Sequence, residues 1–81
     1  MATAGLRVTV ASPDGVVFNG LAQTVICPGE QGTFEILLLH RPLVSRLIAG
    51  RLIIDGKAFP IRRGAVRVAE DEMTAVVELP G

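Results

Sequence analysis

The sequence predicts an all-β domain, an antiparallel sandwich or barrel, from three observations. Segments of four to seven residues in which apolar and polar side chains alternate recur along the chain, and turn residues separate them. Hydrophobic residues make up 49% of the 81 residues, but only three residues are aromatic. The core is therefore mostly Val, Ile and Leu, a mixture that favours strands. In addition, no segment carries a convincing helix signal. The length of the chain suits a single small domain.

The first third of the chain predicts three strands. Residues 6–10 alternate as Leu-Arg-Val-Thr-Val, which is the period of a half-buried strand. Ser12-Pro13-Asp14-Gly15 has the composition of a turn, and a short strand is expected over 16–18. Asn19-Gly20 is the strongest two-residue hairpin signal in the chain. Residues 21–27 should then run back, so that this part forms a β-meander.

The middle of the chain predicts a turn over 28–32 and a strand from Thr33 to Leu37. The segment that follows is ambiguous. We predict two strands, about 43–48 and 51–54, joined near Gly50. A short helix is the alternative, because the apolar residues of this segment also have helical spacing.

A further hairpin turn is predicted at Asp55-Gly56, followed by a strand over Lys57–Arg62. Pro60 has no N–H to donate, so this strand should lie at an edge or carry a bulge. Gly64 is expected to end it.

The last third predicts a strand over Ala65–Ala69, an acidic turn at Glu70-Asp71-Glu72 and a final strand from Met73 to Leu79. The three acidic residues could in principle attract a cation. We interpret them as a solvated turn.

Composition and charge exclude several functions. The formal net charge is zero, which leaves no basic excess for nucleic acid. The longest apolar run, Ile36 to Leu39, is far too short to cross a bilayer. The chain has one histidine and one cysteine, which supply neither a catalytic triad nor a metal site, so no cofactor is expected. Cys27 lies in an apolar strand signal and is interpreted as a buried structural thiol.

A small basic cluster, Arg62-Arg63 with Arg67, has two interpretations. It is either a solvated face or a contact with an acidic surface.

The candidate functional segment runs from Pro28 to Pro42, an exposed corner with an apolar tip. Side chains of a strand alternate between its two faces, so at least one leucine of Leu37–Leu39 should be exposed or covered by another chain. His40 is either a turn histidine whose ring bonds the backbone near Pro42 or an exposed contact with a partner subunit.

Four consecutive segments carry a family resemblance. They are Ser-Pro-Asp-Gly-x-Val-Phe-x-Gly over 12–20, x-Val-x-x-Pro-Gly-x-x-Gly-x-Phe-x-Ile-Leu over 24–37, His-x-Pro-Leu-Val over 40–44 and Leu-x-x-Gly-x-Leu-x-Ile over 47–54. In this order and spacing, the chain resembles the epsilon subunit of the rotary F-type ATP synthase, which is called delta in mitochondria.

The resemblance implies a flattened antiparallel β-sandwich of about ten short strands, residues 1–81, and a mechanical role. In the family this domain is a non-catalytic part of the central stalk. It binds the gamma subunit and the polar loops of the c-ring, so that rotation of the ring turns gamma. The implied location is peripheral, on the cytoplasmic face of the bacterial inner membrane, as part of the complex and without insertion into the membrane. The implied interface residues are Glu30, Gln31, Thr33, Glu35, Leu38, Leu39, His40, Arg41 and Pro42.

The chain departs from the family pattern in three places. It stops where the family commonly continues into a helical hairpin, so ATP binding and inhibition of hydrolysis are not predicted. Leu38-Leu39 stand where the family often has Pro followed by Gly or Asn. Arg62-Arg63-Gly64-Ala65 stand where Gly-Gly and an aromatic or aliphatic residue are usual. These departures favour an alternative function, a diverged β-sandwich module that binds another protein through the Leu37–Leu39 tip. An enzyme is the third and most distant interpretation.

Overall fold

A computed structural model describes residues 5–81, and these residues form nine strands and no helix. The prediction of an all-β fold is confirmed. The strands are β1 (Leu6–Ser12), β2 (Gly15–Ala22), β3 (Thr24–Gly29), β4 (Gly32–Leu37), β5 (Leu43–Leu47), β6 (Gly50–Ile54), β7 (Lys57–Ile61), β8 (Arg63–Ala69) and β9 (Glu72–Glu78).

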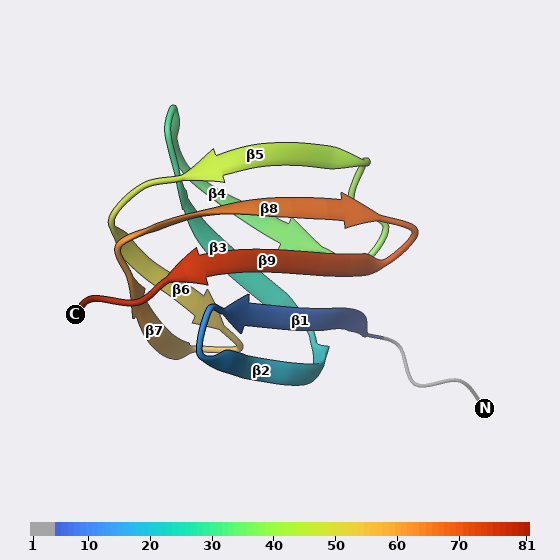
Figure 1. Cartoon of the computed structure of the whole chain (residues 1–81). Helices are drawn as coiled ribbons and strands as arrows, with labels where there is room; N and C mark the ends of the chain where they lie inside the picture. Colours follow the sequence, from blue (N-terminus) through green and yellow to red (C-terminus); the bar gives the residue numbers. More distant parts are fainter. Residues whose placement is uncertain (1–4) are drawn as a thin grey trace.

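The nine strands belong to one sheet that curls into two packed layers (Figure 1). Strands β2-β1-β9-β8-β5 form a five-stranded layer, and β4-β3-β6-β7 form a four-stranded layer behind it. A single residue pair, Gly29 with Leu47, joins β3 to β5 and so links the layers. Neighbouring strands are antiparallel except β1 and β9, which are parallel.

The predicted hairpin at Asn19-Gly20 is wrong. Strand β2 continues through both residues, which pair with Thr9 and Val8 of β1. The turn lies earlier, between the paired Ser12 and Gly15, where Gly15 has a φ of 134°. The ladder to β1 overrides the local turn preference of Asn-Gly, because the extended strand can then pair with β1 along its whole length, from Gly15 to Ala22. The predicted meander is also wrong, since β3 pairs with β4, β5 and β6 but not with β2.

The ambiguous middle segment forms the two predicted strands, β5 and β6, and the helix alternative is excluded. Residues 48–49 make a bend between them, and the Ile48 N–H donates to the carbonyl oxygen of Pro28 at 2.9 Å. Both strands therefore pair along one edge of β3. The apolar spacing resembles that of a helix because Val44, on the outer face of β5, and Ile48, in the bend, are apolar although both are exposed.

Two expectations about the third quarter of the chain have different outcomes. Strand β7, which contains Pro60, is an edge strand as predicted. The break before β8 falls at Arg62, however, and Gly64 lies inside β8. A Cβ atom at position 64 would lie 2.5 Å from the carbonyl oxygen of Val76. Gly64 is thus a point of close strand approach, where only glycine fits.

The two late turns are where the sequence places them. Asp55-Gly56 joins β6 to β7 with φ values of 47° and 82°. Glu70-Asp71 joins β8 to β9 with φ values of 52° and 61°. Positive φ at both central residues is the geometry of a two-residue hairpin whose twist matches the strands.

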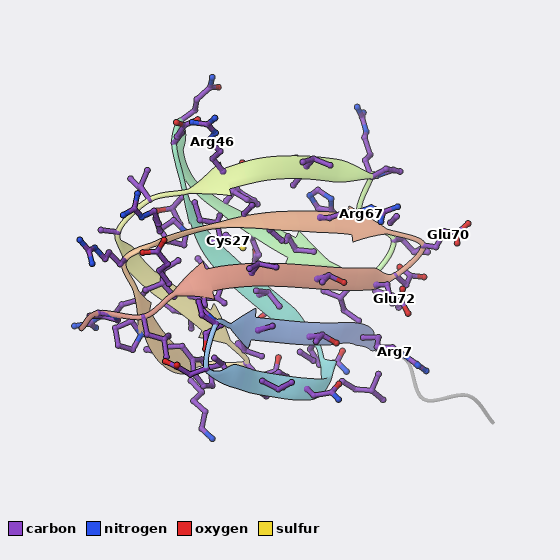
Figure 2. The ribbon with its side chains drawn as sticks, viewed as in Figure 1. Arg7, Cys27, Arg46, Arg67, Glu70 and Glu72 are labelled. Carbon is purple, nitrogen blue, oxygen red and sulfur yellow. The ribbon has the colours of Figure 1, made fainter. Side chains whose placement is uncertain are left out.

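The core lies between the two layers and receives buried hydrophobic side chains from all nine strands. No buried side chain in the described residues is polar or charged. Cys27 is fully buried, with its thiol free, as predicted (Figure 2). Desolvation raises the pKa of this thiol to about 12, so a reactive thiolate is not available near neutral pH.

Cys27 should make the stability of the fold depend on alkaline pH. Above the ordinary thiol pKa of 9.0 the unfolded chain loses this proton, whereas the folded chain keeps it until about pH 12. The contribution is therefore fully present below pH 9 and is lost as the pH rises from 9 to 12. Between pH 7 and pH 10 the free energy of unfolding should fall by about 1 kcal/mol more in the native protein than in the variant Cys27→Ala. Urea unfolding of both proteins at the two pH values measures this, and a difference that does not change with pH would contradict it.

Candidate functional site

The residues predicted as an interface lie on β4 and at its two ends, not at one corner. Glu30 and Gln31 form the tip of the β3–β4 hairpin, and residues 38–42 form the link between β4 and β5. The six residues of β4 lie between them, so the two ends are about 20 Å apart at roughly 3.3 Å per residue. Figure 1 shows the tip at the upper left and the link at the right. The structure therefore divides the predicted site into two surfaces.

Strand β4 presents the polar members of the set to solvent. Thr33 and Glu35 are exposed on the outer face of the four-stranded layer, whereas Phe34 and Ile36 point toward the core. This is the alternation expected of a strand with one buried face. The polar side chains of β4 thus continue the exposed surface of the hairpin tip.

The link from β4 to β5 begins with a turn that exposes all three leucines. Leu37, Leu38 and Leu39 are 46%, 38% and 83% exposed, so the prediction that at least one is exposed is confirmed. The His40 N–H donates to the carbonyl oxygen of Leu37 at 3.1 Å and closes the turn. Leu39 is its third residue and has a φ of 66°. Left-handed geometry is unfavourable for leucine by about 1–2 kcal/mol, and glycine or asparagine would adopt it more readily.

Asp71 holds this turn from another part of the chain. Its Oδ1 accepts a hydrogen bond from the Leu39 N–H at 2.6 Å, and its carbonyl oxygen accepts one from the Arg7 N–H at 3.0 Å. The β8–β9 hairpin is thereby tied both to the leucine turn and to the start of β1. Sequence reasoning treated Asp71 as a solvated turn residue, because no local pattern indicates that the β4–β5 link lies beside it.

His40 is half-buried, and its Nδ1 donates to the carbonyl oxygen of Arg41 at 2.7 Å. This is the contact expected of a turn histidine next to Pro42. The ring keeps part of its surface exposed, and its contact with a partner subunit stays a prediction.

The predicted basic cluster divides between two ends of the five-stranded layer. Arg67 lies near Glu70 and Glu72 (Figure 2) and lines a shallow hollow with them. Arg62 and Arg63 instead line an open groove of about 770 Å³ at the opposite end, together with Arg46 of β5. Arg46 was not among the predicted residues, because its proximity depends on the pairing of β5 with β8.

No group of three or more His, Cys, Asp or Glu side chains suitable for a metal ion occurs within residues 5–81. Over the same residues, no helix is long and apolar enough to cross a membrane.

The solved structures that this chain resembles show its fold. The central stalk and c-ring structure of Tetrahymena thermophila mitochondrial ATP synthase contains a chain that superposes with a TM-score of 0.82 at 16% identity, covering 96% of this chain and 66% of that chain. A chain of the Euglena gracilis mitochondrial ATP synthase structure with OSCP, F1 and c-ring also gives 0.82, at 19% identity, covering 95% and 52%. The molecule therefore has the β-sandwich fold found in mitochondrial ATP synthases.

The sequence comparisons show the family. The model of the ATP synthase delta/epsilon chain β-sandwich domain matches residues 5–79. The epsilon chain of Nitratiruptor sp. is 38% identical over 78 residues, covering 90% of this chain and 60% of the relative. That of Shouchella clausii is 35% identical, covering 93% and 59%. The chain belongs to the ATP synthase delta/epsilon family and spans about 60% of the length of these curated relatives.

Leu39→Asn should stabilise the domain. Asparagine tolerates positive φ better than leucine does, so we expect a gain of about 0.5–1 kcal/mol and a rise in Tm of roughly 3–6 °C. Leu38→Asn is the matched control, because it makes the same change at a neighbouring position that lacks a positive φ. Thermal unfolding of the two variants measures the difference. Equal Tm values would show that the turn stores no strain at Leu39.

Asp71→Ala should free the leucine turn without unfolding the sandwich. It removes the carboxylate that accepts the Leu39 N–H, whereas Asp71→Asn keeps an oxygen acceptor at the same place. We expect amide hydrogen exchange at Leu39 to accelerate about tenfold or more in the alanine variant and much less in the asparagine variant. Exchange rates that match in the two variants would contradict the proposed contact.

Proposed function

We propose that this chain is a non-catalytic subunit of the central stalk of an F-type ATP synthase, and that it couples the c-ring to gamma. The match of the family model over residues 5–79 carries the proposal. The structural neighbours support it, because they come from structures described as containing the central stalk, F1 and the c-ring. Its place in the complex would be peripheral, on the cytoplasmic face of the bacterial inner membrane, with no ATP bound by this domain.

The two ends of β4 suit two different partners. The hairpin tip is polar, with Glu30 and Gln31 exposed, which favours a contact with the polar loops of the c-ring. The leucine turn exposes apolar side chains and is held in place by Asp71, which favours a drier contact with gamma. A coupling subunit needs two surfaces that keep a fixed distance, and β4 supplies one at each end.

A second candidate function rests on the same turn. Leu39 is 83% exposed and has an unfavourable φ. A leucine that costs stability at an exposed position favours a role of its side chain in binding. A diverged module that uses this tip to bind a protein outside ATP synthase would present the same feature.

Replacement of both Leu38 and Leu39 by serine should weaken binding to the cognate gamma subunit by tenfold or more, because exposed apolar anchors dominate binding energy. Val16→Ser with Val44→Ser is the matched control, since both valines are exposed on strands of the five-stranded layer and neither lies in the leucine turn. Calorimetric titration of gamma with each protein measures the affinities, and circular dichroism checks the fold.

Absence of micromolar binding between the unaltered chain and gamma would overturn the coupling role. Purification of the tagged chain from native membranes then separates the two candidates. Recovery of gamma and c supports the stalk subunit, whereas loss of a different, leucine-dependent partner in the double serine variant supports the second function.

A further inference from the structure

The groove that contains Arg46, Arg62 and Arg63 is a separate feature of the molecule. It lies at the end of the five-stranded layer where β5 bends into β6 and where β8 begins. Its apolar surface includes Ile48, Ala65 and Val76, and the last of these is 58% exposed. Of the predicted interface residues, only Glu30 lines it.

Strand register explains why the floor of this groove is open. Ala65 of β8 lies between Arg46 of β5 and Val76 of β9 on the outer face of the layer. Alanine fills little of the space above the sheet, so the arginine and the valine stand apart with a hollow between them. Arg63 lies two residues from Ala65 on the same face, diagonally across from Arg46, and diagonal neighbours of this kind are about 7–8 Å apart.

The charges around the groove are incompletely matched. Arg63 Nε lies 3.3 Å from Glu78 Oε1, with both side chains largely exposed, so this pair contributes little to stability. Arg46 and Arg62 form no ion pair with any residue from 5 to 81. Glu30 is the remaining carboxylate on the rim. The Arg46 and Arg62 guanidinium groups therefore border an apolar floor without forming an ion pair among residues 5–81.

We propose that this groove binds an acidic segment of a partner protein, one that carries carboxylates on either side of an apolar side chain. Guanidinium groups recognise carboxylates through paired hydrogen bonds, and Ala65 and Val76 accept the apolar side chain between them. The two rim glutamates disfavour a nucleic acid or an anionic membrane, both of which favour uninterrupted positive charge. The inference goes beyond the coupling function and does not depend on it, because the groove is distinct from the leucine turn.

The probe for this proposal is the acetylated, amidated peptide Glu-Leu-Glu-Ala-Leu-Glu, titrated into the ¹⁵N-labelled chain. We expect saturable shifts confined to the amides of residues 46–49, 62–65 and 76–78, and to the Arg46 Nε–H. Arg46→Gln with Arg62→Gln should weaken binding about tenfold or more. Arg51→Gln with Lys57→Gln removes the same charge from exposed positions of the four-stranded layer and should leave the affinity unchanged. Thermal unfolding confirms that both double variants fold.

Three results would overturn the proposal. They are the absence of shifts at millimolar peptide, equal affinity for the peptide with every Glu replaced by Gln, and equal weakening by the two double variants. Tighter binding of inorganic phosphate or of phosphatidylglycerol vesicles through the same arginines would also overturn it, in favour of a phosphate or membrane site. None of these results bears on gamma binding, which the Leu38 and Leu39 variants test separately.

Discussion

The fold depends on the joint at which β5 and β3 meet. The residue pair Gly29–Leu47 is the only ladder contact between the two layers within the described residues. Gly29 can have no side chain there, because a Cβ would lie 2.7 Å from the Phe34 ring and 2.8 Å from the carbonyl oxygen of Gly32. The adjacent hydrogen bond from Ile48 to Pro28 fixes the bend that follows β5. A side chain at position 29 would displace Phe34 and the start of β4, and the core against which Phe34 packs would lose its close packing.

The same joint determines what lies at this end of the molecule. The bend brings Ile48 beside the start of β8, and this arrangement forms one wall of the arginine groove. The hairpin that contains Gly29 carries Glu30 at its tip and places that carboxylate on the groove's rim. The polar tip and the groove therefore have a common structural origin, although we assign them to different partners. Changes to the joint should affect both surfaces, whereas the leucine turn is anchored independently by Asp71.

Local patterns predicted most strands, because alternation and turn chemistry act over a few residues. They gave β5 and β6 and the turns at Asp55-Gly56 and Glu70-Asp71. Prediction failed where partners distant in sequence decide the outcome. Asn19 and Gly20 pair with β1 as part of strand β2, and β1 itself pairs in parallel with the last strand, β9. The candidate site shows the same limit. A family resemblance suggested its residues, but their separation by the length of β4, the contact of Asp71 with Leu39 and the proximity of Arg46 to Arg63 follow from tertiary pairing alone.

The coupling role proposed above would require the domain to transmit force between two contacts with little deformation, and the architecture around β4 would suit this. All six residues of β4 pair with β3, from Gly32 opposite Gly29 to Leu37 opposite Thr24. A force applied along β4 is thus shared by the whole ladder and does not fall on one contact. At the leucine turn, Asp71 passes part of it to β8, β9 and β1 through two hydrogen bonds. The leucine turn is fixed by the φ of Leu39 and by Asp71, which connects it to β8, β9 and β1, so it should resist bending more than a flexible loop would. We therefore interpret the unfavourable φ of Leu39 as the cost of a stiff turn.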